Sequence, residues 1–350
     1  MTAKSMPLWI VRAADVTTGP SSWAMRPRSP LPAQFLGRPF VVDEARAAGL
    51  SPGRLRGADL SVPHRGVRAP SGSRSHRQRA EAYAELMDDS MLFSHVTAAH
   101  LLGAPLPQRL LGGPIHVSVL APQRAPRVRG VIGHQLAPRE YRGLSNGRLR
   151  VLDLADVWVQ LAGILTLDEV IVGGDYLITG SEPWDGRAPL TSWAELAAAV
   201  ERAGSARGVR VARAALEEVR YGCLSPQETR LRLLIERAGL PAPVLNHRIF
   251  DESGRTVAML DGAYPERRLA YEYMGDHHRA DRRTYRNDMV RRARVEDLGW
   301  TQLDISADDL DLRPLETLAR IARRLSATEP RAHARANPID LAVVASKRPR

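Results

Sequence analysis

The 350-residue chain is poor in cysteine, lysine and long apolar runs. Its single cysteine, Cys223, excludes an internal disulfide framework and a zinc site built from several cysteines. Its two lysines, Lys4 and Lys347, lie near the chain ends, so none is expected at an interior catalytic site. No apolar run approaches a membrane span, and the first residues lack the apolar core and cleavage site of a secretory signal. We therefore expect a cytoplasmic protein with no membrane partner.

The charge balance favours a polyanionic partner. The formal net charge is +11 and the sequence pI is about 10.5, and nucleic acid is the commonest partner of so basic a protein. Nearly all the basic residues are arginine and alanine is abundant, which a GC-rich genome would also produce. Because arginine binds phosphate through two parallel hydrogen bonds, the composition is compatible with either explanation.

The length and the 44% hydrophobic content predict packed cores in two or three domains. We expect an α/β (α+β) multi-domain fold divided at breaks in composition. The expected segments are a flexible extension (1–30, with Met25 as an alternative start), a winged helix-turn-helix (31–75), an α/β middle module (76–180), a linker and helical pair (181–222), a mixed α/β domain (223–325) and a disordered basic tail (326–350).

The winged-helix prediction depends on residues 40–68. Asp43 to Ala48 predicts a short helix, Ser51-Pro52 opens a second helix, and Val62 to Val67 predicts a strand pair with a basic tip. This stretch resembles the N-terminal domain of AbiEi-family antitoxins, which implies duplex DNA binding and allows a cognate toxin or other regulatory partner. The alternative is a small helical cap used for packing. The expected DNA contacts are Arg54, Arg56, His64 and Arg65.

The middle module is predicted from alternating helical and strand patterns. Strands are expected at 115–120 and 130–136, and helices at 80–87, from 93 to Gly103, at 151–161 and at 167–178. The helical pair that follows the break at 181–190 is expected at 191–203 and 208–221. The string around Ser94 and His95 again resembles the AbiEi-related layout. We do not expect this pair to be a catalytic nucleophile and base, because adjacent helical side chains diverge and Ser94 is a natural N-cap.

Residues 225–300 carry the strongest chemical signal. Ser225, Pro226 and Glu228 predict a capped helix running to Ala238, and 257–263 and 268–273 predict two strands joined by a turn. Asp261 and Glu272 stand on those strands, and pairing of the strands would bring their carboxylates together. Such a pair suits Mg²⁺, with Mn²⁺ as a substitute, because a hard cation prefers oxygen ligands and promotes attack on a phosphodiester.

These residues resemble the PD-(D/E)XK nuclease superfamily, and in particular the very-short-patch-repair (Vsr-like) endonucleases. The matching pieces are Ser225-Pro226-x-Glu228-Thr229, Asp261, Glu272-Tyr273-x-Gly275, His277-His278, and a helix containing Tyr285, Asp288 and Arg292 before Leu298-Gly299-Trp300. The resemblance implies a restriction-endonuclease-like domain with a mixed central sheet. It assigns Asp261 and Glu272 to the metal, gives Glu228, His277 and His278 catalytic roles, and places Arg291, Arg292 and Arg294 against the DNA backbone.

One departure from the superfamily pattern separates two functions. The lysine expected two positions after Glu272 is replaced by Met274, and a histidine at 277 or 278 is the available substitute. The first expectation is a metal-dependent endonuclease that hydrolyses DNA, with RNA not excluded as substrate. The alternative is a non-catalytic, antitoxin-type DNA-binding regulator that retains the nuclease fold. Glu228 could serve only its helix cap, Asp261-Gly262 could be a turn, and the histidines could be surface residues.

Overall fold

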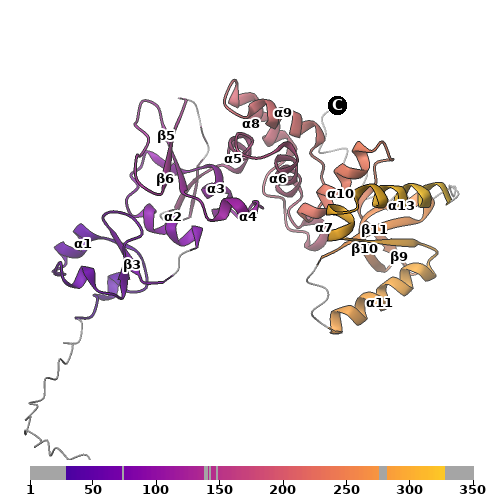
Figure 1. The fold of residues 1–350 in the computed structure, drawn as a ribbon, viewed down its shortest axis with the longest axis horizontal. Helices are drawn as coiled ribbons and strands as arrows, with labels where there is room; N and C mark the ends of the chain where they lie inside the picture. Colours follow the sequence, from indigo (N-terminus) through magenta and orange to yellow (C-terminus); the bar gives the residue numbers. More distant parts are fainter. Residues whose placement is uncertain are drawn as a thin grey trace, which may run out of the picture.

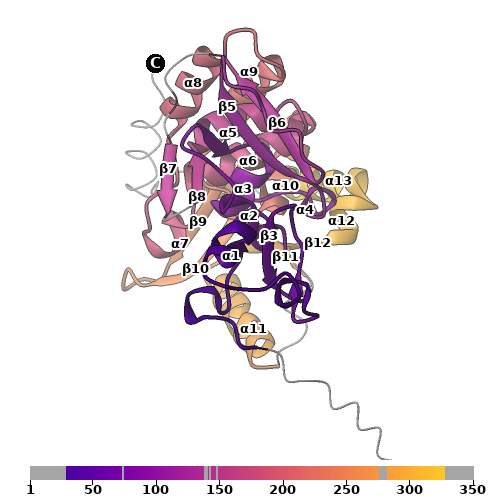
Figure 2. The same ribbon diagram turned by 90° about the vertical axis from the view of Figure 1, so that its left-hand side faces the viewer.

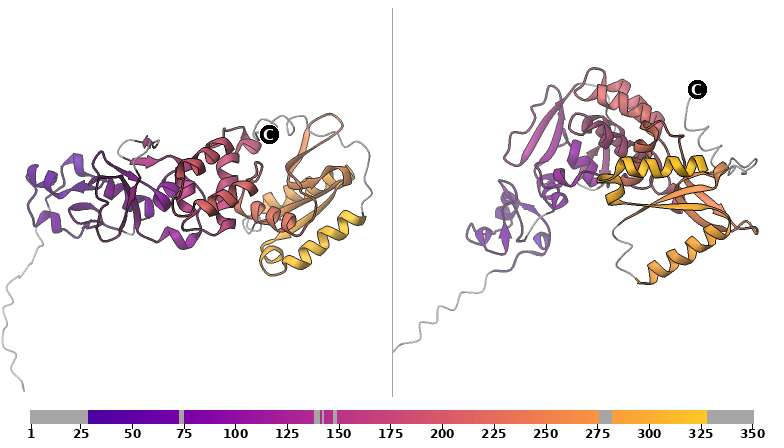
Figure 3. Two further views of the ribbon diagram at one scale, coloured as in Figure 1. Left: turned by 90° about the horizontal axis from the view of Figure 1, so that it is seen from above. Right: turned by 45° about the vertical axis from the view of Figure 1, so that its right-hand side comes forward.

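The computed structural model describes residues 29–72, 75–137, 141, 143–146, 149–275 and 282–327. Three β-sheets follow one another along an elongated molecule, as the sequence colouring shows (Figures 1 and 3). The predicted α/β multi-domain fold is confirmed. Nearly all of the predicted extension (1–30) and tail (326–350) lies outside the described residues.

The N-terminal unit is a small three-stranded sheet with one short helix. The strand order is β1-β3-β2, and both pairings are antiparallel. Phe35, Phe40, Ala45 and Leu55 form its core. The elements are η1 (Ala33–Phe35), β1 (Phe40–Val41), α1 (Val42–Ala47), η2 (Arg54–Arg56), β2 (Leu60–Ser61) and β3 (Val67–Pro70).

This unit differs from the predicted winged helix in its second helix. The predicted helix after Ser51-Pro52 is a single 3-10 turn, η2, which is too short to enter a major groove as a recognition helix. Gly53 and Gly57 flank the turn, and glycine is an unfavourable helix residue. The hairpin of β2 and β3 is present, although its strands overlap the predicted 62–67 segment only at Val67.

The middle sheet has the order β6-β5-β4-β8-β7, with β5 and β6 paired in parallel at one edge (Figure 2). The predicted strand at 115–120 is confirmed as β5. The predicted start of a helix at 151 is corrected, because 149–152 pairs with β7 and the helix begins after the N-cap Asp153. The elements are α2 (His76–Ala84), β4 (Met91–Phe93), α3 (His95–Leu101), α4 (Gln108–Leu111), β5 (Ile115–Leu120), β6 (Val131–Leu136), β7 (Gly143–Asn146) and β8 (Leu149–Leu152).

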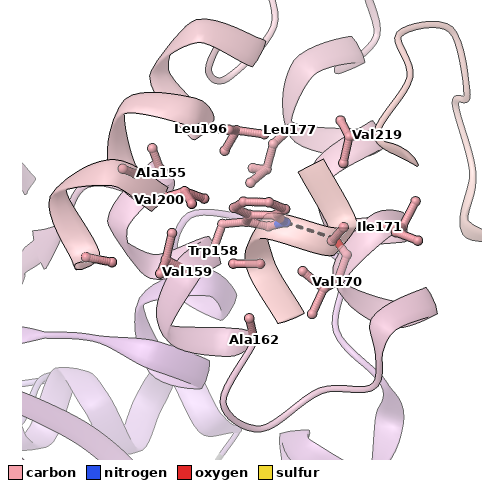
Figure 4. Packing of buried hydrophobic residues seen from close by; sticks show 14 of the residues in the cluster. Ala155, Trp158, Val159, Ala162, Val170, Ile171, Leu177, Leu196, Val200 and Val219 are labelled. Atoms are coloured by element: carbon pink, nitrogen blue, oxygen red, sulfur yellow. Dashed lines mark hydrogen bonds between the residues drawn. The ribbon is translucent and has the colours of Figure 1, made fainter. Parts of the chain in front are cut away.

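A helical bundle follows the middle sheet. The buried Trp158 ring lies at its centre and donates from Nε1 to the Val170 carbonyl at 2.8 Å (Figure 4). Leu177, Leu196 and Val219 come from other parts of the chain to pack in the same core. The helices are α5 (Leu154–Leu161), α6 (Leu167–Thr179), α7 (Glu182–Asp185), α8 (Trp193–Ala203) and α9 (Val209–Glu218).

The bundle changes the predicted domain boundary at 180/181. Helices α8 and α9, assigned to a linker segment, share one hydrophobic core with α5 and α6. The Pro/Gly-rich stretch at 181–190 is therefore a loop with a short helix inside one structural unit, because the helices on both sides bury their apolar faces against each other.

The C-terminal module has a mixed four-stranded sheet in the order β12-β11-β10-β9. Strand β11 is antiparallel to β10 and parallel to β12, as the predicted mixed sheet requires. The residues around Ile321 and those around Val295 form separate clusters, and α13 and α11 cover opposite faces of the sheet (Figure 3, right). The elements are α10 (Pro226–Arg237), β9 (Val244–Phe250), β10 (Thr256–Tyr264), η3 (Pro265–Arg267), β11 (Leu269–Met274), α11 (Arg282–Asp297), β12 (Thr301–Ser306), α12 (Ala307–Asp311) and α13 (Pro314–Ala327).

A buried ion pair joins this module to the helical bundle. Arg232 of α10 and Asp175 of α6 are both fully buried, with Nη2 and Oδ2 2.9 Å apart. Asp175 also accepts from Thr229 Oγ1 at 3.0 Å and from the Arg220 N–H at 2.7 Å. Removing one member would leave an uncompensated buried charge, which costs about 3–5 kcal/mol. The pair therefore fixes how α10, and with it Glu228, lies against the bundle.

No helix among the described residues is long and apolar enough to cross a membrane.

Candidate functional site

Asp261 lies inside a strand rather than in a turn. Strand β10 runs through Thr256–Tyr264, and Gly262 pairs with Tyr271 of β11. A Cβ on Gly262 would lie 2.2 Å from the Tyr271 hydroxyl oxygen. Glycine at 262 therefore makes room for the Tyr271 ring, and the alternative that Asp261-Gly262 forms a turn is wrong.

The pairing of β10 and β11 brings Asp261 and Glu272 to neighbouring positions, as predicted from their spacing. Asp261 Oδ2 accepts a hydrogen bond from the Tyr273 backbone N–H at 2.7 Å. Among the described residues, Asp261 Oδ1 has no hydrogen-bond donor. One carboxylate oxygen is thus held by the strand and the other remains available to a ligand.

Glu272 is held from two further elements. Arg291 of α11 donates from Nη2 to both carboxylate oxygens, at 2.8 and 3.0 Å. Gln302 of β12 donates from Nε2 to Oε2 at 3.0 Å. The Glu272 side chain retains 16% exposure. The carboxylate is therefore oriented by a cation and an amide while remaining open to solvent on one side.

Glu228 completes the cluster from the first turn of α10. Ser225 Oγ accepts from the Glu228 N–H at 3.2 Å, as a helix cap should. The predicted reciprocal bond is different: Glu228 Oε2 accepts from the Leu224 N–H at 2.8 Å and from Asn246 Nδ2 at 3.3 Å, rather than from the Ser225 N–H. The buried Glu228 carboxylate thus contacts both the helix start and strand β9.

The three carboxylates are electrostatically coupled. Burial raises the pKa of Asp261 well above its usual value, and the charges of Glu228 and Glu272 raise it further, whereas the Tyr273 N–H and Arg291 oppose the shift. Burial also raises the pKa of Glu228, with a smaller contribution from Glu272, against hydrogen bonds that lower it. Ionising the cluster is therefore costly unless a cation is added.

This donor set fits a hard divalent cation. Carboxylate oxygens are the ligands that Mg²⁺ and Mn²⁺ prefer, and the charges of Glu228 and Glu272 both act on the Asp261 carboxyl group. In such a site the cation would be held by Asp261 and Glu272, with Glu228 close by. Arg291 already neutralises part of the charge at Glu272, so metal and guanidinium would compete for that carboxylate.

Two of the predicted N-terminal DNA contacts have internal partners. Arg54 forms a two-bond ion pair with Asp59, at 3.1 and 2.7 Å, and its side chain is 10% exposed. His64 is buried, its Nε2 is 3.0 Å from the Arg79 carbonyl oxygen, and its ring contacts Tyr83. The structure therefore does not place Arg54 and His64 on an exposed surface that could contact DNA.

Of the other predicted DNA contacts, some are exposed and some have acidic partners. Arg56 and Arg65 are exposed, and their contact with DNA stays a prediction. In α11, Arg294 is exposed, whereas Arg292 donates to Glu296 at 3.1 Å and to Asp304. Arg291 orients Glu272, so of Arg291, Arg292 and Arg294, only Arg294 is turned to solvent without an acidic partner.

The nuclease pattern also involves the two predicted histidines and the position of the usual lysine. His277 and His278 lie outside the described residues. Met274, at the usual lysine position, ends β11 and pairs in register with Ser306. Lys4 and Lys347 also lie outside the described residues, so the described part of the site contains no lysine.

Two polar residues at the site were missed from the sequence. Gln302 bridges Glu272 and Asp304, with 3.0 Å contacts to both. Asn246 adopts a left-handed backbone conformation (φ 46°) and its amide reaches Glu228. The polar residues within 301–305 and 244–250 were the available signal, but their roles depend on the strand order and, for Asn246, on strand β9, which was not predicted.

Comparison with known proteins gives little guidance. No family model matches the chain, and no solved structure matches it. Two Mycobacterium tuberculosis proteins, the uncharacterized proteins MT2308 and Rv2248 from two strains, are each 34% identical over 131 residues. The match covers 37% of this chain and 48% of each relative, so the chain spans about half the length of the curated relatives it matches.

Proposed function

We propose that the chain is a metal-dependent endonuclease of the Vsr-like type that acts on DNA in the cytoplasm. The observation that carries the proposal is the convergence of Glu228, Asp261 and Glu272 from α10, β10 and β11 in one coupled carboxylate cluster. The C-terminal arrangement of helix, three strands, helix and strand, with β11 parallel to β12, supports the resemblance inferred from the motifs.

Each residue of the site has a proposed role. Asp261 and Glu272 would hold Mg²⁺, and the bound ion would supply an acidified water and stabilise charge on the scissile phosphate. Glu228 would accept a hydrogen bond from a water at the cluster, and Gln302 keeps the Glu272 carboxylate in position. Arg294 offers an exposed cation to the DNA backbone, and binding should weaken steeply as salt rises, because counterions are released from DNA.

The experiment is cleavage of supercoiled plasmid with Mg²⁺, with Mn²⁺ and with chelator. Asp261→Asn is compared with Asp297→Asn, which changes the same charge at an exposed position of α11. We expect metal-dependent nicking by the wild type and by Asp297→Asn, and none by Asp261→Asn. Single-stranded RNA of matched length forms a second arm, and cleavage of RNA alone would contradict the assignment to DNA.

A second function is favoured by one specific observation. Met274 replaces the expected lysine, and the two bonds from Arg291 already neutralise Glu272 without a metal. This arrangement suits a DNA-binding regulator of antitoxin type in which the nuclease fold is retained for stability or partner contact. A wild-type protein that binds duplex DNA, gains no stability from Mg²⁺ and never nicks would establish this second function.

A further inference from the structure

Three histidines gather on the middle sheet, away from the carboxylate cluster. His95 begins α3, His116 lies on β5 and His134 lies on β6. One ring nitrogen from each lies within 4.8 Å of the others. We propose that these imidazoles form a second metal site, for a borderline-soft divalent ion of the Zn²⁺ class, and we call the three residues the histidine triad.

The sheet register places two of the ligands. In the parallel pair β5–β6, Ser118 is opposite His134. His116 is two residues before Ser118 and therefore on the same face. His116 Nδ1 and His134 Nε2 are 3.0 Å apart. Tetrahedral Zn²⁺ with bonds of about 2.0–2.1 Å would separate ligand nitrogens by about 3.4 Å, so a small movement lets an ion replace the proton that these nitrogens share.

The third ligand is held by an unusual backbone conformation. His95 has φ 48°, a left-handed conformation uncommon for a residue with a side chain. Its backbone N–H donates to Gln160 Oε1 at 3.0 Å. Its ring stacks on His134 with centroids 3.8 Å apart and planes 17° apart. Because stacked rings aim their lone pairs in nearly parallel directions, coordination of one ion requires the His95 ring to tilt.

The buried hydroxyl groups of Ser94, Thr97 and Ser118 support the triad. His95 Nδ1 lies 3.0 Å from Ser94 Oγ, and Ser118 Oγ donates to the same oxygen at 2.7 Å. The His116 backbone N–H donates to Thr97 Oγ1 at 2.8 Å. Metal-binding histidines commonly donate their second ring N–H to such a partner. In the tautomer whose Nδ1–H donates to Ser94 Oγ, the His95 Nε2 is left for the metal.

This arrangement corrects the prediction for Ser94 and His95. Ser94 is the residue before α3, but its side chain makes no capping bond to the helix backbone. The two adjacent side chains do not diverge, because the left-handed φ of His95 turns its ring back toward Ser94. The pair acts here as a ligand and its supporting hydroxyl.

The donor chemistry selects the kind of ion. Imidazole nitrogen suits Zn²⁺, Co²⁺, Ni²⁺ and Cu²⁺, whereas Mg²⁺ prefers oxygen. Three protein ligands leave a fourth position for water or an added donor, and His134 on the edge strand β6 is half-buried, which gives the ion a path from solvent.

The test is direct metal titration of tag-free protein. Zn²⁺ is titrated against a coloured chelator, and Co²⁺ is added separately to look for the visible bands of tetrahedral nitrogen coordination. We expect one strong Zn²⁺ equivalent per chain and tetrahedral Co²⁺ bands. His134→Gln, on the edge strand, should weaken Zn²⁺ binding by more than about tenfold while keeping the wild-type circular dichroism.

Control variants distinguish Zn²⁺ binding at the triad from binding elsewhere on the protein. His100→Gln changes a histidine of α3 outside the triad and should bind Zn²⁺ like the wild type. Asp261→Asn should also retain it, so failure of the nuclease proposal would leave this result untouched. Absence of tight Zn²⁺ binding by the wild type overturns the proposal. Equal affinity in His134→Gln and wild type also overturns it, as does binding that is lost only when His277 and His278 are replaced.

Discussion

Arg291 lies directly on Glu272, with its Nη2 2.8 and 3.0 Å from the two carboxylate oxygens. The same guanidinium nitrogen is 3.5 Å from Asp288. Through this contact α11 supplies a positive charge to a cluster of three acids. A metal at Glu272 would have to compete with this guanidinium.

Replacing Arg291 with Gln should make the C-terminal module depend more strongly on metal. Without the guanidinium the three carboxylates lose their neutralising charge, so the melting temperature (Tm) should fall in chelator. A ligand that binds only the folded state stabilises it, by about 2.7 kcal/mol at a hundredfold excess over its Kd. The rise in Tm on adding Mg²⁺ should therefore be larger in Arg291→Gln than in wild type, as measured by differential scanning fluorimetry.

The control for that experiment is Arg294→Gln, which removes an exposed cation from the same helix. Its Tm in chelator and its Mg²⁺ response should match the wild type. If Arg291→Gln and Arg294→Gln respond to Mg²⁺ equally, Arg291 does not compete with metal at Glu272.

Asp261→Asn should stabilise the metal-free protein at neutral and alkaline pH. The pKa of Asp261 is raised in the folded state by burial and by Glu228. A raised carboxyl pKa favours folding below the unfolded pKa of about 4, and that contribution is lost as pH rises through the folded pKa. In chelator, the wild-type Tm should therefore fall more than that of the Asn variant as pH rises above the unfolded pKa of about 4.

Mg²⁺ should reverse that pH dependence in the wild type. Metal competes with protons for the carboxylates, so the Tm rise should grow as pH increases, and Asp261→Asn should show none at any pH. A wild-type Tm in chelator that rises over the same pH range as steeply as that of Asp261→Asn would contradict the burial argument.

Glu228→Gln should separate stability from metal binding. The Gln carbonyl can still accept from the Leu224 N–H, which Glu228 Oε2 accepts at 2.8 Å, so unfolding free energy in chelator should stay within about 0.5 kcal/mol of wild type or rise. Nicking should fall if Glu228 serves the reaction. Urea unfolding and plasmid cleavage on the same preparation measure both quantities, and unchanged nicking would reduce Glu228 to a helix-capping residue.

Gly262→Ala should be strongly destabilising although the residue lies in a strand. A Cβ there would lie 2.1 Å from a ring carbon of the buried Tyr271, and such overpacking costs about 1–3 kcal/mol or more. Gly112→Ala is the control, because a Cβ at 112 meets no atom within 4 Å. Urea unfolding should show a lower midpoint for the first variant alone, and equal midpoints would contradict the close contact of Gly262 and Tyr271.

Much of the C-terminal site could be predicted because its signals are local. Ser225, Pro226 and Glu228 mark the start of α10, and the spacing of Asp261 and Glu272 across a short turn fits an antiparallel pair. Gln302 could not be assigned in the same way. Its contact with Glu272 depends on β12 pairing in parallel beside β11, a relation set by the packing of α11 rather than by neighbouring letters.

In the N-terminal half, local sequence signals predicted less of the structure. Ser51-Pro52 is a good helix-start signal, but Gly53 and Gly57 weaken the helix and the chain forms one 3-10 turn. The histidine triad was missed because its members are separated by 21 and 18 residues, and no local spacing links His95, His116 and His134. The left-handed φ of His95, which brings its ring back to Ser94, has no signal in the sequence.

The most direct test of the central claim is the rate of Mg²⁺-dependent nicking of supercoiled plasmid by the wild type, Asp261→Asn and Asp297→Asn, purified in parallel. The account predicts nicking by the wild type and Asp297→Asn that stops in chelator, and none by Asp261→Asn, with wild-type circular dichroism in all three. Nicking by Asp261→Asn at the wild-type rate, or no nicking by the wild type in either Mg²⁺ or Mn²⁺, would contradict it.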